Sequence, residues 1–207
     1  MWRAGLLLNR CMYPIGLALA TSLVAIGPSC CPGAEAATHL QVLDLAGRQV
    51  DPLRPSGAKA TVFVFVRTDC PVSNRYAPEI RRVYEEFIPR GAAFWLVYVD
   101  PSESAETIRE HMKEYGYRLD ALRDPKHALV RLTGVQVTPE VAVFRQVRGG
   151  PEMVYRGRID DRYVDLGKMR PAPTTHDLER VLQEIVNGKQ VSPETTHAVG
   201  CFISDLR

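Results

Sequence analysis

A single cysteine lies where a buried strand is predicted to turn into a helix, and this junction constrains the fold more than any other feature. Residues Thr61–Val66 are apolar or β-branched without a turn-former, the pattern of a strand covered on both faces. Pro71 suits the first helical turn, because its ring fixes φ and its missing N–H needs no partner there. Cys70 is therefore predicted at a helix N-terminus, where the helix dipole favours the nucleophilic thiolate.

The first 36 residues have the order of a secretory leader. Arg3 and Arg10 precede an apolar stretch over residues 13–26, and the small-x-small triplet Ala34-Glu35-Ala36 follows it. We predict that residues 1–36 are a signal peptide cleaved after Ala36 and that the mature chain is exported to the periplasm or outside the cell. The apolar stretch is short for a membrane span.

A retained anchor is the alternative, with Cys30 or Cys31 as a lipidated residue. It fits less well, because Gly-Pro-Ser precedes Cys30 where a lipoprotein needs a leucine followed by small residues. Cleavage would leave two of the five cysteines, Cys70 and Cys201. In an oxidising compartment a disulfide between them is admissible.

Charge and hydropathy exclude several classes of function. The 26 basic and 24 acidic residues nearly cancel, and no basic stripe is present, so we expect no nucleic-acid partner. No second apolar run could span a bilayer, so we expect no stable membrane span after cleavage. Residues 37–188 are long enough for one domain with its own core, and residues 189–207 follow as a tail that carries Cys201.

Strands and helices alternate along the predicted domain. The pattern predicts a hairpin over 40–50, strands over 61–66, 92–99 and 141–144, a return strand over 153–155 and a loop over 160–173. It also predicts four helices. One runs from Cys70 through Phe87, one lies near 103–115, one begins at Asp124-Pro125, and one begins at Thr174-x-x-Asp177. This order predicts an α/β fold in which helices cover both faces of a mixed central sheet.

The chain resembles thioredoxin-fold proteins of the redoxin type, the AhpC/TSA and TlpA-like relatives, over about residues 40–188. Their C-x-x-C motif and the helix proline five residues later correspond here to Cys70-Pro71-Val72-Ser73 and Pro78. Their cis-proline corresponds to Pro139 in Val137-Thr138-Pro139. The resemblance implies a thioredoxin-like fold and a cis Thr138–Pro139 peptide whose backbone lies beside Cys70.

Two departures from the family motifs bear on function. Ser73 replaces the second cysteine, so Cys70 cannot be resolved within its own motif. Peroxiredoxins carry Thr or Ser three residues before the reactive cysteine, where this chain has Arg67, and a proline where it has Phe63. The resemblance implies either a thiol-disulfide oxidoreductase or a peroxiredoxin-like thiol peroxidase. Its partners would be a disulfide- or peroxide-bearing substrate and an external thiol reductant, with no cofactor.

The candidate site residues are Cys70 as nucleophile, Cys201 as resolving thiol, Thr138 and Pro139 beside the sulfur, and Arg67 as a cationic partner. Cys201 lies thirteen residues after Gly188, an extended reach of about 43 Å, so the tail can reach any face of the domain. A flexible tail with an incidental thiol stays open as an alternative. We expect little besides a Cys70–Cys201 bond to hold the tail.

Two charged groups give further alternatives. An arginine of the cluster at 156, 158 and 162, beside Asp160 and Asp161, could lower the pKa of Cys70, although most such clusters are surface ion pairs. His176 and His197 could form a Cys/His metal site, as in the exported Sco-type copper chaperones. Those proteins use C-x-x-x-C, whereas this chain has Asn74 at that place. The alternative function is a non-catalytic metal-binding or cofactor-maturation module, but we expect no metal.

Overall fold

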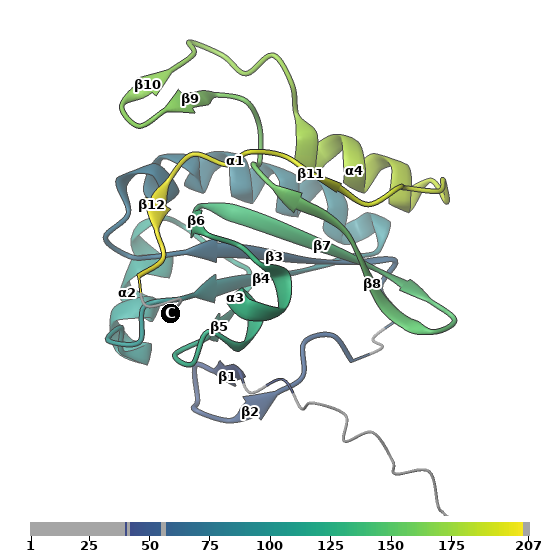
Figure 1. The fold of residues 1–207 in the computed structure, drawn as a ribbon. Helices are drawn as coiled ribbons and strands as arrows, with labels where there is room; N and C mark the ends of the chain where they lie inside the picture. Colours follow the sequence, from purple (N-terminus) through teal and green to yellow (C-terminus); the bar gives the residue numbers. More distant parts are fainter. Residues whose placement is uncertain (1–39, 41, 55–56, 205–207) are drawn as a thin grey trace, which may run out of the picture. The chain divides into compact units, whose positions relative to one another are not determined.

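An eight-stranded mixed sheet runs through the computed structural model, which describes residue 40 and residues 42–54 and 57–204 (Figure 1). The strand order is β11-β8-β7-β3-β4-β5-β1-β2. The strands are β1 (Val42–Asp44), β2 (Gln49–Val50), β3 (Ala60–Val66), β4 (Ala92–Tyr98), β5 (Asp120–Arg123), β7 (Glu140–Val147), β8 (Gly150–Gly157) and β11 (Glu194–Thr195). β3, β4 and β5 are parallel, and β7 and β8 form an antiparallel hairpin. The predicted mixed sheet is confirmed.

Helices cover both faces of this sheet, as predicted. The helices are α1 (Pro71–Phe87), the 3-10 turn η1 (Ile88–Arg90), α2 (Ala105–Glu114), α3 (Ala128–Thr133) and α4 (Asp177–Val186). β3 is buried on both sides, with Val62, Val64 and Val66 packed in a cluster with α1, α2 and α4. Phe63 and Phe65 pack in the opposite cluster, which includes α3. The α1 helix is therefore anchored on the most buried strand of the sheet.

The predicted start of α3 is wrong by three residues. The helix begins at Ala128 and not at Asp124-Pro125. The Asp124 carboxylate still caps it, because it accepts hydrogen bonds from the N–H groups of Ala128 at 2.6 Å and Val130 at 3.0 Å. The sequence pattern found the capping residue but not the loop between cap and helix.

The predicted capping box at the start of α4 is also wrong. The helix begins at Asp177, and no side chain caps it. The backbone N–H of Thr174 donates to Asp161 at 2.6 Å, and the Asp177 carboxylate accepts from Arg158 at 2.7 Å. Both residues of the expected box thus bind partners in the preceding segment.

Short strands account for the elements that the sequence pattern missed. β5 was not predicted, and the expected loop over 160–173 contains the small hairpin of β9 (Tyr163–Asp165) and β10 (Lys168–Met169). The edge hairpin of β1 and β2 was predicted correctly. The predicted leader and its cleavage site lie outside the described residues, among which no helix is long and apolar enough to cross a membrane.

The C-terminal tail is held by more than its cysteine, which contradicts the expectation of a loosely attached segment. β11 pairs parallel with β8, and β12 (Cys201–Phe202) pairs antiparallel with β6 (Val137–Thr138) (Figure 1). Val191, Ala198 and Ile203 are buried. These apolar side chains stabilise the tail on the domain independently of any disulfide.

Candidate functional site

Cys70 occupies the N-cap of α1, as the sequence predicts. It is 1% exposed, and its sulfur accepts a hydrogen bond from the backbone N–H of Ser73 at 3.4 Å. Pro71 stands at the first position of the helix, where its missing N–H leaves no donor unsatisfied. The thiol is thus fixed by the junction between the buried strand β3 and the helix α1.

The Thr138–Pro139 peptide is cis, and its backbone lies beside Cys70. The carbonyl oxygen of Thr138 is 3.0 Å from Cys70 Sγ and accepts a hydrogen bond from the thiol. Both parts of the prediction for this peptide are confirmed. The strand β6, which ends at Thr138, therefore forms one wall of the sulfur site.

Cys201, on the strand β12 that pairs with β6, lies next to Cys70. The two Sγ atoms are 2.7 Å apart, and neither cysteine is in a disulfide. In the β12–β6 pairing Cys201 lies opposite Thr138, and Ile203 N–H donates to the carbonyl of Gln136 at 2.9 Å. Since a disulfide bond is about 2.05 Å long, little movement separates the two sulfurs from a bond.

A glycine allows this close approach of the tail. A Cβ at Gly200 would overlap the carbonyl group of Thr138, although the backbone of Gly200 does not have a positive φ. The requirement for glycine is therefore steric rather than conformational. Any other residue at this position would push β12 away from β6 and separate the sulfurs.

The two thiols differ in ionisation. Burial raises the pKa of Cys70, but hydrogen bonding with Cys201, Ser73 and Thr138 outweighs this effect and leaves the pKa below the ordinary thiol value. Burial and the neighbouring Cys70 together raise the pKa of Cys201 to about 12. Of the two thiols, Cys70 is therefore the more readily ionised, which suits Cys70 as the attacking sulfur.

Two hydroxyl groups support the Cys70 thiolate. Ser73 Oγ and Thr138 Oγ1 are buried without a hydrogen-bond partner in the described part of the chain, and both residues lower the pKa of Cys70. Sequence reasoning named Thr138 but treated Ser73 only as a missing cysteine. Its position one helical turn after the N-cap was the available signal, since helical side chains lean toward the helix N-terminus.

Arg67 does not act on Cys70 as predicted. Its guanidinium donates to Asp69 at 3.0 Å and to Asp100 at 3.1 Å, so its charge is shared between two carboxylates. It lowers the pKa of Cys201, but it is not among the main influences on the pKa of Cys70. Asp69 and Asp100 thus hold the guanidinium that the sequence predicted beside the Cys70 thiolate.

A buried polar network, which the sequence pattern missed, holds the loop before Cys70. The Glu103 carboxylate accepts hydrogen bonds from the backbone N–H and the hydroxyl of Thr68, both at 2.7 Å. The Asn74 side chain donates to the Thr68 carbonyl at 2.9 Å and contacts His111 at 2.9 Å. Glu103 lies just before α2 and connects the start of that helix to the loop before Cys70.

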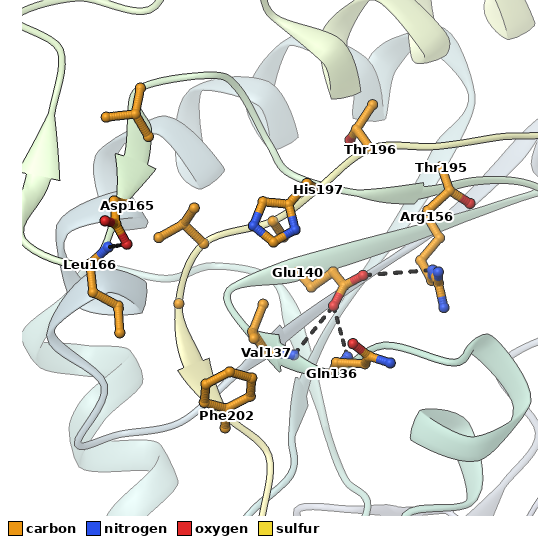
Figure 2. A pocket seen from close by; sticks show the side chains of 14 residues that line it. Gln136, Val137, Glu140, Arg156, Asp165, Leu166, Thr195, Thr196, His197 and Phe202 are labelled. Atoms are coloured by element: carbon orange, nitrogen blue, oxygen red, sulfur yellow. Dashed lines mark hydrogen bonds and ion pairs between the residues drawn. The ribbon is translucent and has the colours of Figure 1, made fainter.

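A cavity of about 540 Å³ lies on the other side of the tail (Figure 2). Gly200 and Phe202 line it, but Cys201 does not, because successive side chains of a strand point to opposite faces. Figure 2 shows the Glu140 carboxylate bound to the backbone N–H of Val137 and paired with Arg156. The cavity therefore borders the tail without opening at the sulfurs.

The alternative charged groups do not gather at Cys70. Arg156 pairs with Glu140, Arg158 pairs with Asp177, and His197 lines the cavity. In the described ranges, the one group of possible metal ligands consists of Glu79, Asp160 and His176, and it includes neither cysteine. The Cys/His arrangement of a Sco-like site is therefore not assembled around the thiols.

The fold and the cysteine site define a thioredoxin-like redoxin. The sequence matches the AhpC/TSA family over residues 33–154, more than half of the 207 residues, and the chain belongs to that family. This membership supports a redox function in general. The matched residues include Cys70 and Pro139 but not the tail with Cys201.

Solved structures show the same fold at low sequence identity. A hypothetical protein from Sinorhizobium meliloti 1021 is 22% identical with a TM-score of 0.65, covering 78% of this chain and 88% of its own. An uncharacterized conserved protein from Geobacillus kaustophilus is also 22% identical with a TM-score of 0.65, covering 79% and 87%. The thioredoxin domain of a thiol-disulfide oxidoreductase from Bacteroides vulgatus is 15% identical with a TM-score of 0.50, covering 72% and 96%. No curated protein sequence matches the chain.

Proposed function

We propose that this protein is an exported thiol-disulfide oxidoreductase in which Cys70 is the nucleophile and Cys201 the resolving thiol. The observation that carries the proposal is the separation of 2.7 Å between the two sulfurs, because Ser73 removes the usual partner from the active-site motif. The opposite pKa shifts of the two thiols support the assignment of roles. The thiol-disulfide oxidoreductase among the similar structures agrees with this class of reaction.

The reaction proceeds by two thiol–disulfide exchanges. The Cys70 thiolate attacks one sulfur of a substrate disulfide, forms a mixed disulfide, and releases the other substrate sulfur as a thiolate. Cys201, after losing its proton to solvent or to the released thiolate, attacks Cys70 Sγ and frees the second substrate sulfur. The substrate gains two electrons, and the protein is left with a Cys70–Cys201 disulfide that an external thiol must reduce.

Peroxide reduction is the second candidate, favoured by the AhpC/TSA membership and by the two hydroxyls beside Cys70. The Cys70 thiolate would attack one peroxide oxygen, become a sulfenic acid, and release an alcohol or water after protonation. Cys201 would then displace water from the sulfenic acid and give the same disulfide. The two candidates thus share the second half of the cycle and differ only in the first substrate.

One assay on the isolated protein separates these candidates. With dithiothreitol as reductant, turnover is measured on insulin disulfides and on hydrogen peroxide for the native chain, Cys70→Ser and Cys201→Ser. We expect Cys70→Ser to lose turnover on the true substrate, and Cys201→Ser to accumulate a mixed disulfide or a sulfenic acid on Cys70. Turnover unchanged in Cys70→Ser would refute the nucleophile, and turnover unchanged in Cys201→Ser would refute the resolving role. Ser192→Ala, exposed in the tail, is the matched control.

The proposed export rests on the leader pattern of residues 1–36 and is tested separately. Intact-mass measurement of the protein from its native compartment should give an N-terminus near Ala37. A mature protein that begins at Met1 would refute cleavage. A mass increase on a chain beginning at Cys30 or Cys31 would instead support the lipidated alternative.

A further inference from the structure

Three side chains that can bind a metal ion gather at a second site, which contains neither cysteine. Glu79 lies in α1, Asp160 in the segment between β8 and β9, and His176 at the N-cap of α4. A ligand atom of each residue lies within 4.8 Å of those of the other two. Since α1 and α4 pack on the same face of the sheet (Figure 1), the fold brings together segments that are distant in the chain.

Asp160 is the residue that points to a bound cation. Its side chain is 1% exposed, and its Oδ1 accepts hydrogen bonds from the Tyr76 hydroxyl at 2.5 Å and from the Arg162 N–H at 2.9 Å. Its Oδ2 is buried too, and among the residues that the structure describes it has no hydrogen-bond donor. A buried carboxylate oxygen without a partner is unfavourable. The two hydrogen bonds fix the carboxylate, and a cation would satisfy the oxygen that they leave.

Glu79 and His176 are placed to bind the same cation. His176 Nδ1 is 4.0 Å from Glu79 Oε1. Ligand atoms around a tetrahedral zinc, with bonds of about 2.0–2.2 Å, lie roughly 3.3–3.6 Å apart, so only a small movement is needed. The half-exposed His176 side chain can make it. Arg82 donates to both Glu79 oxygens, at 2.7 and 3.0 Å, and orients this carboxylate, while each oxygen keeps a second lone pair.

The charges around the site favour a cation. Three carboxylates, those of Glu79, Asp160 and Glu179, belong to the site or border it. Two guanidinium groups oppose them. Arg82 pairs with both Glu79 and Glu179, and Arg162 acts on Glu79 as well. Three negative charges against two positive ones leave an excess of negative charge, which attracts a cation.

We propose that Glu79, Asp160 and His176 bind a divalent cation of the zinc class, which ties α1 to α4 and to the segment between β8 and β9. One imidazole nitrogen and two carboxylate oxygens suit Zn²⁺, whereas Ca²⁺ and Mg²⁺ take oxygen ligands. Three protein ligands leave a fourth position for water on the exposed side of His176. Glu79 lies nine residues after Cys70, about 14 Å along the axis of α1, so the site does not take part in the thiol chemistry.

Zinc itself is the probe, in a chain without thiols or an affinity tag. All five cysteines of the full-length chain are replaced by serine, so that no thiol competes for the metal. Calorimetric titration with zinc chloride near neutral pH gives the stoichiometry and the Kd, and the Tm is measured with and without zinc. The variants are His176→Ala and Asp160→Asn. The control is His197→Ala, exposed in the tail outside the site.

We expect one zinc per chain and a Tm higher by about 5–10 °C at a zinc concentration of one hundred times the Kd. His176→Ala and Asp160→Asn should each weaken binding by at least about tenfold, since even the loss of a group that only orients a ligand has that effect. His197→Ala should bind zinc with the Kd of the parent chain. The absence of binding, or equal binding in His176→Ala, would overturn the inference.

Two further measurements keep the test independent of folding defects. His176 is half-exposed and does not cap α4, so the Tm of His176→Ala without zinc should match that of the parent chain. In the native chain with its cysteines, His176→Ala should lower the metal retained after dialysis by one zinc per chain, and an unchanged content would refute the site. Neither result depends on turnover at Cys70 and Cys201, so the proposed function stands or falls separately.

Discussion

The two halves of the thiol site are built in opposite ways. Cys70 lies at the junction between the most buried strand of the sheet and the 17-residue helix α1, and this junction fixes its position. Cys201 lies on a two-residue strand at the end of a tail, and its position depends on β6, 63 residues earlier in the chain, counting from Thr138. We call β3, α1 with Cys70, and β6 the rigid half of the site, and the tail from residue 189 with Cys201 the tail half. The nucleophile is held in the rigid half, and the proposed resolving thiol is on the more weakly attached tail half.

This difference explains why the two thiols have different ionisation. Hydrogen bonding of Cys70 with Cys201, Ser73 and Thr138 lowers its pKa despite burial. Burial dominates at Cys201, where the neighbouring Cys70 adds to it, so its thiol form is stabilised. A pair of this kind directs the first attack to one sulfur and the resolving step to the other.

The largest expected effect comes from detaching the tail half. In Gly200→Val the new side chain overlaps the Thr138 carbonyl, so β12 leaves β6 and Cys201 becomes a loosely tethered thiol. We expect the rate of Cys70–Cys201 disulfide formation to fall by at least about a hundredfold, because the oriented pair is replaced by a flexible tether. The measurement is the rate at which the linked tryptic peptides appear after addition of one equivalent of oxidant.

The matched control is Gly149→Ala, at a turn glycine where an added Cβ meets nothing within 4 Å. It should leave the rate unchanged. Equal rates in Gly200→Val and the native chain would show that the strand pairing does not position Cys201, and the contrast between the two halves would be lost.

The second effect concerns the rigid half alone. In Ser73→Ala the Cys70 thiolate loses one hydroxyl donor, so the pKa of Cys70 should rise toward the ordinary thiol value. A hydrogen bond to a charged group contributes about 1.5–3 kcal/mol, so iodoacetamide should alkylate Cys70 roughly tenfold more slowly at pH 7. The two rates should converge at high pH, where both proteins carry the thiolate. The exposed Ser192→Ala is the control, and an unchanged pH profile in Ser73→Ala would contradict the assignment.

The rigid half could be predicted from the sequence, because its signals are local. A continuous apolar strand, a cysteine and a first-turn proline specify the strand–helix junction without reference to the rest of the chain. The cis peptide at Pro139 was predicted only through resemblance to a family, since most X–Pro bonds are trans. Arg67 was predicted to act on Cys70 because the two residues are close in the sequence. Its partner Asp100 is 33 residues further along the chain, so a local pattern cannot reveal that pairing.

The tail half could not be predicted, because its contacts are between distant residues. Two-residue strands such as β11 and β12 have no periodicity that a sequence pattern can detect. The role of Gly200 becomes visible only when the Thr138 carbonyl is placed beside it. The tail's length showed that Cys201 could reach Cys70, but reach alone does not determine a register.

A smaller effect should follow from weakening the anchor of the tail at a distance from the sulfurs. The Thr196 hydroxyl accepts a hydrogen bond from the Arg158 N–H at 3.2 Å and contacts the Tyr155 hydroxyl at 2.7 Å. In Thr196→Val both contacts are lost, at a cost of about 1 kcal/mol each. We expect disulfide formation to slow by a few fold, much less than in Gly200→Val. The exposed Thr195→Val is the control, and a loss in Thr196→Val as large as in Gly200→Val would mean that the tail is released as one unit.

The smallest effect tests the buried support of the rigid half. Burial raises the pKa of Glu103 above its ordinary value, against the lowering effect of the hydrogen bonds from Thr68. The folded protein therefore binds this proton more tightly than the unfolded chain, so the free energy of unfolding should fall as pH rises from about 4.5 toward the folded pKa. Glu103→Gln keeps an oxygen for Thr68 but cannot ionise, so between pH 5 and pH 7 its Tm should fall less than that of the native chain. The difference should be a few degrees, since about 1 kcal/mol shifts Tm by roughly 2–4 °C at this size. The control is Glu106→Gln, exposed in the first turn of α2, whose Tm should fall with pH as that of the native chain does. If the Tm of Glu103→Gln also falls as much as that of the native chain, the Glu103 carboxyl does not titrate between pH 5 and pH 7.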